Sequence, residues 1–265
     1  MPSDDAPNDV YRRAQAQFGR TAAAYVTSAG HARGAELAEM VAYAETVFGT
    51  LEGRTVLDVA TGGGHTALAF ARAGASVTAT DLTPEMLAAA EAFIGTDAGV
   101  VFQAASAEAL PFAAETFSIV TCRIAAHHFA DPGRFVREAA RVLEPGGLLL
   151  LVDNVAPEND ELDRLMNDIE AQRDSSHVRA YRIQEWTAIF TAAGLEPRVH
   201  SRWWTVKPYR EWMDRAGASE DVREALEQGV LALTPPQKAY FRVVEADGKL
   251  ESLAHEAVLL VGRKG

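Results

Sequence analysis

Short apolar segments alternate with longer segments in which apolar residues recur every three or four positions, from about residue 51 to residue 195. The short segments predict buried strands and the longer ones predict amphipathic helices. The expected strands are Thr55–Val59, Ser76–Thr80, Val100–Ala104, Phe117–Cys122 and Leu148–Val152. Because strand–helix alternation implies parallel strands with right-handed crossovers, the chain is expected to form an α/β fold.

Turn and capping residues place the helices between these strands. A helix over His65–Ala73 is expected to stop at Gly74, and Thr83-Pro84 begins another that runs to about Ile94. Asp131-Pro132 begins a third helix, which ends near Val142. Before the first strand, apolar residues at helical spacing predict that the segment up to about Thr50 is helical.

The C-terminal third is less regular. Its expected elements are helices over Glu158–Arg173 and Gln184–Ala193, a strand within Leu195–Val206, two helical stretches in Tyr209–Glu245, and a last strand over His255–Arg263. No linker divides the chain. We therefore predict an N-terminal helical lid segment (1–50) and one domain (51–265) with helical insertions near 156–181 and 209–245.

Composition narrows the function classes. The 265 residues carry 37 acidic and 25 basic side chains, a net charge of −12, which argues against binding to nucleic acid. The single cysteine, Cys122, cannot form an internal disulfide, and the N-terminus lacks the basic and apolar regions of a signal peptide. No apolar run approaches the ~20 residues of a membrane span. We expect a cytoplasmic protein, and the helical additions could serve to form a homodimer.

The most informative motif is a strand that enters a glycine-rich turn and then a helix, over Val56–His65. Such a turn lets the backbone approach a ligand, and the helix presents free N–H groups to an anion. Gly62-x-Gly64-x-x-Ala67 also fits the fingerprint of nicotinamide dinucleotide enzymes, so the glycines alone do not choose a cofactor.

Two acidic residues at strand ends favour a cationic nucleoside. Asp58 would repel a pyrophosphate at the glycine turn, whereas it suits the ammonium and sulfonium groups of S-adenosylmethionine. Asp81, at the end of the second strand, can accept hydrogen bonds from both ribose hydroxyls. The alternatives, that Asp58 only caps the loop and Asp81 only caps the next helix, stay open here.

Five segments together resemble a known family. They are VLDVATGGG, VTATDLTPEML, AEALPFAAETFSIV, AAHHFADP and RVLEPGGLLLLVD, and their order and spacing resemble class I S-adenosylmethionine-dependent methyltransferases. The resemblance covers about Phe18 to Leu195 and is strongest to the group related to ubiquinone and menaquinone biosynthesis. It implies a Rossmann-like three-layer sandwich whose seven-stranded, mostly parallel sheet carries its last strand antiparallel beside the fifth.

The resemblance also implies a set of cofactor-binding residues. Asp58 and Gly62, Gly63 and Gly64 would hold the methionine end, Asp81 the ribose, and Leu82 and Met86 the adenosine, while Ser106, Ala107 and Glu108 would border the adenine, and Arg123 would face the methionine and the acceptor. Two positions depart from the family pattern. Ala60 replaces a glycine, and Ser106 replaces an aspartate that would accept from the adenine amino group.

Methyl transfer from a sulfonium depends mainly on alignment of the methyl group with the acceptor atom, so it does not require a fixed set of catalytic residues. A base helps when the acceptor is a hydroxyl or an acidic carbon, and His127 and His128 follow the fourth strand. In a helix they would point about 100° apart, so at most one is expected to face the pocket. His177 and Arg179 lie in a polar segment that either closes over the substrate or is a solvated surface loop.

Other candidates are weaker. Phe18, Tyr25 and His31 stand where related enzymes have lid residues, and the aromatic residues that could line an apolar acceptor pocket are Trp203, Trp204, Trp212 and Phe241. No metal-binding motif is present. The expected function is therefore transfer of a methyl group from S-adenosylmethionine to a small organic acceptor, aromatic or quinone-like. The alternatives are a nicotinamide-dependent oxidoreductase and a non-catalytic cofactor-binding protein.

Overall fold

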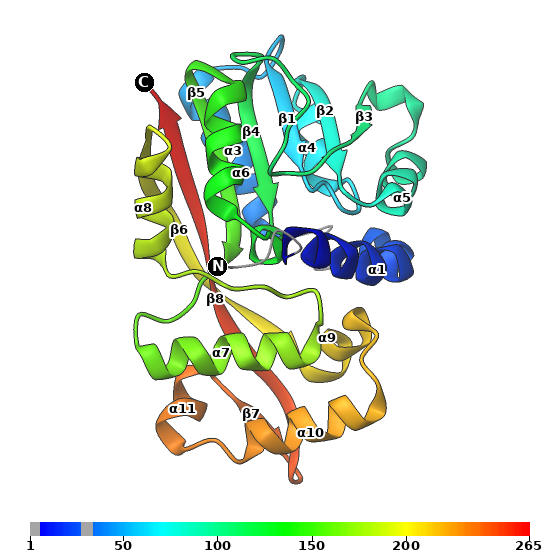
Figure 1. The fold of residues 1–265 in the computed structure, drawn as a ribbon, viewed down its shortest axis with the longest axis vertical. Helices are drawn as coiled ribbons and strands as arrows, with labels where there is room; N and C mark the ends of the chain where they lie inside the picture. The colour runs from blue at the N-terminus through cyan, green and yellow to red at the C-terminus, as the bar shows by residue number, and fades with distance from the viewer. Residues whose placement is uncertain (1–5, 28–33) are drawn as a thin grey trace.

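An eight-stranded sheet forms the centre of the computed structural model, which describes residues 6–27 and 34–265 (Figure 1). The strand order is β3-β2-β1-β4-β5-β8-β6, and β7 pairs with β8 beside this path. The strands are β1 (Thr55–Val59), β2 (Ser76–Asp81), β3 (Val101–Ala104), β4 (Phe117–Arg123), β5 (Leu143–Asn154), β6 (Leu195–Pro208), β7 (Val244–Ala246) and β8 (Lys249–Lys264).

The first five strands are parallel, and β8 lies antiparallel between β5 and β6. The expected Rossmann-like class and the antiparallel last strand beside the fifth are thus confirmed. One strand, Val244–Ala246, was not expected, and it overlaps the end of the helical stretches predicted within Tyr209–Glu245. The Asp247-Gly248 pair, with both φ angles positive (51° and 74°), makes a tight turn that pairs β7 with β8.

Helices cover both faces of the sheet, because strand residues point alternately to the two sides. Val56 of β1 packs in one core with α3 and α4, and Leu57 packs in the other core with α6 and α8. The helices around this part of the sheet are α3 (Ala35–Phe48), α4 (His65–Arg72), α5 (Pro84–Ile94), α6 (Pro132–Val142) and α8 (Ile183–Ala192). Cys122 is fully buried in the second core.

A second lobe lies below the sheet in Figure 1 and is reached by the long strands β6 and β8. Its helices are α7 (Asp160–Arg173), α9 (Tyr209–Ala216), α10 (Glu220–Leu231) and α11 (Pro235–Tyr240). Ile169, Trp212 and Leu253 share a separate core there, which joins the two regions expected as helical insertions. Residues 209–245 hold three helices and a strand instead of two helices, because Gly217 and Thr234-Pro235 end and restart the helix.

Helix α1 (Ala6–Thr27) lies across the junction of the two lobes (Figure 1). The Gln15 side chain donates to the backbone oxygen of Leu82 in the upper lobe, and Gln17 donates to that of Ala216 in the lower lobe. α3, by contrast, packs against the sheet through Met40 and Ala44. The two helices of the N-terminal segment therefore lie in different environments.

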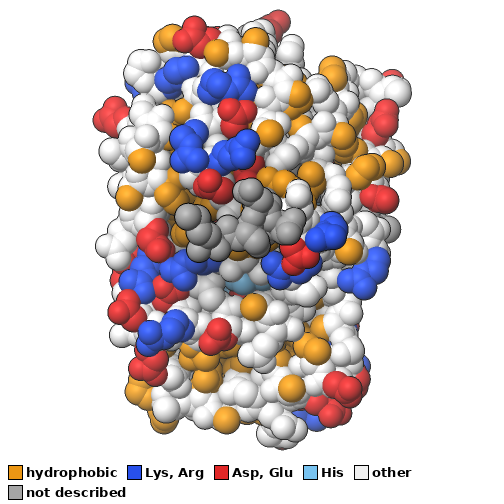
Figure 2. All heavy atoms as spheres, viewed as in Figure 1, with side chains coloured by type: hydrophobic (Ala, Val, Ile, Leu, Met, Phe, Trp, Pro, Cys, Tyr) orange, Lys and Arg blue, Asp and Glu red, His pale blue; other side chains and the backbone are white. Residues whose placement is uncertain are grey.

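The surface is mixed in charge. On the face shown in Figure 2, basic and acidic side chains are interspersed and do not form one basic patch. Among residues 6–27 and 34–265, no helix combines the length and apolarity that a membrane span requires.

Candidate active site

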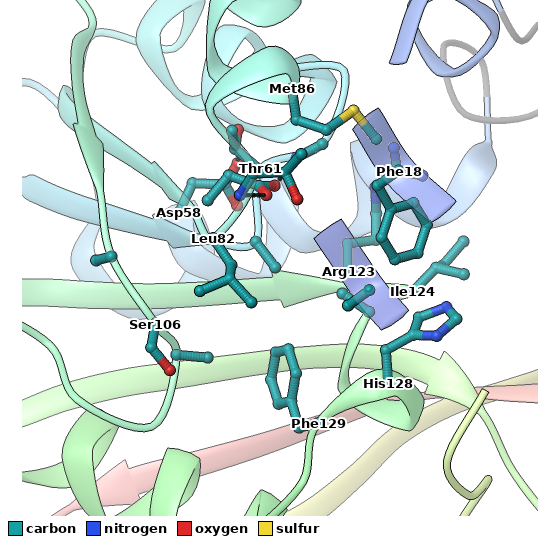
Figure 3. Close-up of a pocket in the computed structure, with 18 of the residues that line it drawn as sticks. Phe18, Asp58, Thr61, Leu82, Met86, Ser106, Arg123, Ile124, His128 and Phe129 are labelled. Atoms are coloured by element: carbon teal, nitrogen blue, oxygen red, sulfur yellow. Dashed lines mark hydrogen bonds between the residues drawn. The ribbon is translucent and has the colours of Figure 1, made fainter. Parts of the chain in front are cut away.

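A cavity of about 980 Å³ lies at the carboxyl ends of β1, β2 and β4, where the crossovers of a parallel sheet leave space for a ligand. We call it the sheet-edge cavity. Every residue predicted to hold the cofactor lines it except Gly64. Figure 3 shows how these side chains surround the space: Asp58, Thr61, Leu82 and Met86 lie on one side, and His128 and Phe129 on the other.

Asp58 is buried at the end of β1. Its two carboxylate oxygens accept hydrogen bonds of 2.7 Å from the hydroxyl groups of Thr61 and Thr121. Burial raises the pKa of Asp58 to about 6, although these two hydrogen bonds and the positive charge of Arg123 act in the opposite direction. A buried carboxylate with so high a pKa gains from a nearby cation, since the cation offsets the lost hydration.

Asp81 ends β2 and faces the same cavity. One carboxylate oxygen accepts from the backbone N–H of Gly62 at 3.0 Å, and the other accepts from that of Thr83 at 2.9 Å. Burial raises the pKa of Asp81, and the two backbone donors partly offset that effect. The carboxylate thus ties the glycine turn to the start of α5, and each oxygen keeps acceptor capacity for a ligand hydroxyl.

The glycine turn needs left-handed backbone at three positions. Ala60 has φ 54°, Gly62 has φ 54° and Gly64 has φ 82°. At Gly62 a Cβ would meet no atom within 4 Å, so glycine serves the backbone conformation. At Gly64 a Cβ would come within 2.8 Å of Cδ1 of Ile94, so glycine there also lets α4 approach α5 closely.

Replacing Ala60 with glycine is expected to stabilise the protein. Alanine in the left-handed region costs roughly 1–2 kcal/mol, and the greater entropy of unfolded glycine offsets roughly 0.5–1 kcal/mol of the gain. Chemical denaturation of Ala60→Gly should therefore show an unfolding free energy raised by about 0.5–1 kcal/mol. The matched change Ala42→Gly, at an exposed position of α3, should lower it by about 1 kcal/mol. A lower unfolding free energy in both variants would contradict backbone strain at Ala60.

The loop after β3 is tied to α1. The Tyr11 hydroxyl donates to Oε2 of Glu108 at 2.9 Å, and Oε1 of Glu108 accepts from the backbone N–H of Ala130 at 2.8 Å. Oγ of Ser106 accepts from the N–H of Glu108 at 3.2 Å and lies 3.4 Å from the Tyr11 hydroxyl. Ser106 thus shapes the loop in addition to lining the cavity, and a helix distant in sequence closes this side.

Arg123 lines the cavity at the end of β4. Its Nη1 forms an ion pair of 3.0 Å with Oε1 of Glu36, and its Nε donates to the hydroxyl of Thr66 at 3.0 Å. Burial lowers the pKa of Arg123, and the negative charges of Glu36 and Asp58 offset part of that effect. The guanidinium is therefore fixed beside the start of α4, where it can bind a carboxylate.

A second cavity, which we call the interlobe cavity, lies between the sheet and the lower lobe, is open to solvent and has an empty volume of about 1450 Å³. It shares Ile124 and His128 with the sheet-edge cavity. Figure 3 shows both residues at the edge of the sheet-edge cavity, beside Phe18 of α1. The two cavities therefore adjoin at these side chains.

His127 and His128 lie in a 3-10 turn (Ala126–His128), and they differ in the cavities that they line: His128 lines both, and His127 lines one. His127 lines only the interlobe cavity, and its Nδ1 lies 2.6 Å from Oδ1 of Asp153. Burial lowers the pKa of His127, but the charge and the hydrogen bond of Asp153 outweigh burial and raise it above its ordinary value. The carboxylate orients the ring, as in a histidine base.

Of this pair, His128 lines the sheet-edge cavity. Its Nδ1 lies 3.0 Å from the carbonyl oxygen of Ser176 and therefore carries the proton of a neutral ring. Burial, followed by the charge of His127, lowers the pKa of His128 well below its ordinary value. The expectation that at most one of the pair faces the cofactor pocket agrees with this arrangement.

His177 lines neither cavity. Its Nε2 lies 3.0 Å from Oδ1 of Asn167, and its ring centroid lies 5.6 Å from that of His127. Arg179 is paired with Asp163 and Glu185. The idea of a solvated surface loop is wrong for Asp174, Ser176 and His177, which are buried because the segment packs under the turn that carries His127.

The aromatic candidates divide between cavity and core. Trp203, Trp204 and Trp212 line the interlobe cavity, whereas Phe241 is buried in a core of the lower lobe. Among the lid candidates, Phe18 lines the sheet-edge cavity. His31 and the side chain of Tyr25 lie outside the described residues.

Several residues of the two cavities were not predicted from sequence. Tyr11, Thr61 and Thr66 line the sheet-edge cavity, and Lys207 lines the interlobe cavity. Asp153 could have been found by the rule that found Asp58 and Asp81, because it also follows an apolar strand. Within residues 6–27 and 34–265, no group of three or more potential ligand side chains is placed to hold a metal ion.

Comparison with known proteins decides the family. The family described as "Methyltransferase domain" matches residues 57–151. The uncharacterized methyltransferase YcgJ of Bacillus subtilis (strain 168) is 36% identical over 251 residues, which are 93% of this chain and 97% of YcgJ. The chain belongs to the class I S-adenosylmethionine-dependent methyltransferases.

Two further matches refine the placement of this methyltransferase. The crystal structure of the B. subtilis YcgJ protein superposes with a TM-score of 0.81 and covers 86% of this chain and 97% of that chain. The demethylmenaquinone methyltransferase of Chlorobaculum parvum is 37% identical over 111 residues, which are 42% of this chain and 45% of that protein. The expected relation to the ubiquinone and menaquinone group is confirmed, and nothing supports the nicotinamide alternative.

Proposed function

We propose that this methyltransferase binds S-adenosylmethionine in the sheet-edge cavity and transfers its methyl group to a small organic acceptor in the interlobe cavity. The observation that carries the proposal is the pair of buried carboxylates, Asp58 and Asp81, on adjacent strands of one cavity. A cationic nucleoside would satisfy both, with its amino acid end at Asp58 and its ribose at Asp81.

The remaining walls suit the same ligand. Leu82, Met86 and Phe129 offer apolar surface to an adenine ring, and Arg123 offers a fixed cation to the methionine carboxylate. The turn has only small residues at the cavity, Ala60, Gly62 and Gly63, so a ligand can approach its backbone closely. Gly64 permits the close packing of α4 against α5 behind the turn. Ser106, Ala107 and Glu108 would border the adenine. S-adenosylmethionine, when bound, supplies an electrophilic methyl group for an in-line displacement.

The same carboxylates disfavour a nicotinamide dinucleotide. A pyrophosphate beside the glycine turn would bring negative charge toward Asp58, whose pKa burial already raises to about 6. The repulsion between the two negative groups would add to the free energy that burial of the Asp58 carboxylate already costs. A dinucleotide is therefore expected to bind far more weakly than S-adenosylmethionine.

The helix α1 is proposed to act as a lid. Tyr11, Ala14 and Phe18 line the sheet-edge cavity, and Phe18 packs edge-on against His128 with ring centroids 4.9 Å apart. Because α1 is anchored to both lobes by side-chain hydrogen bonds, it can exclude water from the point where donor and acceptor meet.

His127 is proposed as the base for an acceptor hydroxyl or acidic carbon. It lines the interlobe cavity, and Asp153 holds its Nδ1, which leaves Nε2 as the atom that can take a proton from the acceptor. His128 stays neutral and is a weak base, since burial holds its pKa well below the ordinary value. In this proposal His128 lines the donor site and does not act as the base.

Isothermal titration calorimetry tests the donor site. Wild-type protein is expected to bind S-adenosylmethionine and to show no comparable heat with NADH. Asp81→Ala should weaken the binding by about ten- to a hundredfold, the 1.5–3 kcal/mol typical of a hydrogen bond to a charged group. Asp97→Ala removes the same charge at an exposed site and should leave the affinity unchanged. Tighter binding of NADH than of S-adenosylmethionine would overturn the proposal.

A further inference from the structure

Lys207 is a buried cation on the wall of the interlobe cavity that β6 forms. Its side chain has no hydrogen-bond or ion-pair partner among the described residues. Unpartnered charges are rarely buried to this extent, because loss of hydration is not compensated. Burial accordingly lowers the pKa of Lys207 to about 8, which still leaves the ammonium mostly charged at neutral pH.

The charged residues around Lys207 do not neutralise it. Glu170 lies in the same cavity, but its Oε2 is bonded to Nε of Arg173 at 3.0 Å and its Oε1 lies 2.9 Å from Nδ1 of His255. Asp153 is engaged by His127. The negative charges of Glu170 and Asp153 raise the pKa of Lys207, whereas the positive charges of Arg173 and Arg215 lower it, and burial prevails. An anion in the cavity would therefore meet the ammonium of Lys207, which has no direct partner in the described part of the chain, with Arg173 and Arg215 on the wall of the same cavity.

Part of the cavity wall is aromatic. Trp203, Trp204 and Trp212 line it, and Trp203 lies on the same face of β6 as Lys207, because residues four apart in a strand share a face. Flat apolar side chains of this kind suit an aromatic ring, with stacked or edge-on contacts. The cavity also reaches His127 and meets the donor cavity at Ile124 and His128.

We infer that the interlobe cavity binds an aromatic acceptor that carries a carboxylate, with Lys207 as the residue that recognises the carboxylate. This inference rests on the proposed function, since the interlobe cavity is an acceptor site only if the donor occupies the sheet-edge cavity. Lys207 selects the acceptor by charge, Trp203 contacts its ring, and a ring hydroxyl or acidic carbon is left for His127.

The test uses the full chain saturated with S-adenosylhomocysteine, which fills the donor site without turnover. Calorimetry then compares two pairs of probes that differ in the carboxylate: 3,4-dihydroxybenzoate against catechol, and 4-hydroxybenzoate against phenol. The wild type is expected to bind at least one acid at least tenfold more tightly than its neutral counterpart. Lys207→Met should abolish this preference, and Lys207→Arg should retain part of it.

Controls separate the possible failures. Lys249→Met removes an exposed lysine at the start of β8 and should keep the preference. Lys207→Met should bind S-adenosylhomocysteine as the wild type does and should melt at a higher temperature, because it removes a buried charge. Absent binding of S-adenosylhomocysteine would count against the proposed function itself. Normal binding of it, with no preference for either acid or with the preference kept in Lys207→Met, would overturn the inference about Lys207.

Discussion

Asp58→Asn is expected to bind S-adenosylmethionine about ten- to a hundredfold more weakly than the wild type while unfolding less readily. The lost affinity corresponds to the roughly 1.5–3 kcal/mol of a charge-assisted hydrogen bond. The gained stability follows from the raised pKa of Asp58, about 6 in the folded protein. A carboxyl group whose pKa rises on folding destabilises the folded state once the pH exceeds its unfolded value.

The pH dependence of binding gives this prediction a second readout. A cation binds the ionised form of Asp58, so affinity should be highest above pH 6 and should fall by about tenfold per unit as the pH drops below that value. In Asp58→Asn that part of the dependence should disappear. Calorimetric titrations between pH 5 and 8 would measure it.

The pH dependence of the unfolding free energy follows from the same shift in the pKa of Asp58. The folded protein holds the Asp58 proton more tightly than the unfolded chain does, so the destabilisation from this residue grows between about pH 4 and 6 and then levels off. At pH 7, Asp58→Asn should raise the unfolding free energy by about 1–3 kcal/mol. Asp168→Asn, at an exposed position of α7, serves as the charge-matched control. Unchanged affinity in Asp58→Asn would remove the central support for the cationic donor.

His127→Asn is expected to lower kcat by about a hundred- to ten-thousandfold, the range typical of a lost general base. The substitution should leave the affinity for S-adenosylmethionine unchanged, because His127 does not line the sheet-edge cavity. Transfer of a labelled methyl group to 3,4-dihydroxybenzoate is the assay. His200→Asn alters an exposed histidine on β6 and should keep full activity.

The pH–rate profile distinguishes a base from a structural histidine. His127 must lose its proton to act, so kcat should rise with pH through a pKa above the ordinary value of 6.5. In Asp153→Asn the raising effect of the carboxylate is gone and burial prevails, so the rising limb should move to lower pH. A rising limb that stays in place in Asp153→Asn would show that another group titrates.

Much of the donor site could be read from local sequence, because strand ends and turns impose strong constraints over few residues. Apolar strands followed directly by acids, at Asp58 and Asp81, locate a cavity at the carboxyl edge of a parallel sheet before any coordinates are known. The glycine turn between them follows from positive φ angles that other residues rarely adopt. The fold class, the two acids and the glycine turn follow from such short-range rules, whereas the other residues expected around the donor came from the resemblance to the family.

The acceptor side was decided by tertiary structure. Lys207 has nothing in its sequence neighbourhood that marks it. Its proposed role arises because β6 carries it into the interlobe cavity, where the nearby carboxylate of Glu170 is paired with Arg173 and His255. Likewise, which of His127 and His128 meets which cavity depends on Asp153 and Ser176, residues brought together by the packing of separate segments. Sequence alone determined the two acids and the glycine turn that we propose to hold a cationic nucleoside, since these residues lie within a single βαβ unit. Only the folded chain determined what lies opposite the donor, because burial and charge pairing depend on contacts between distant parts of the chain.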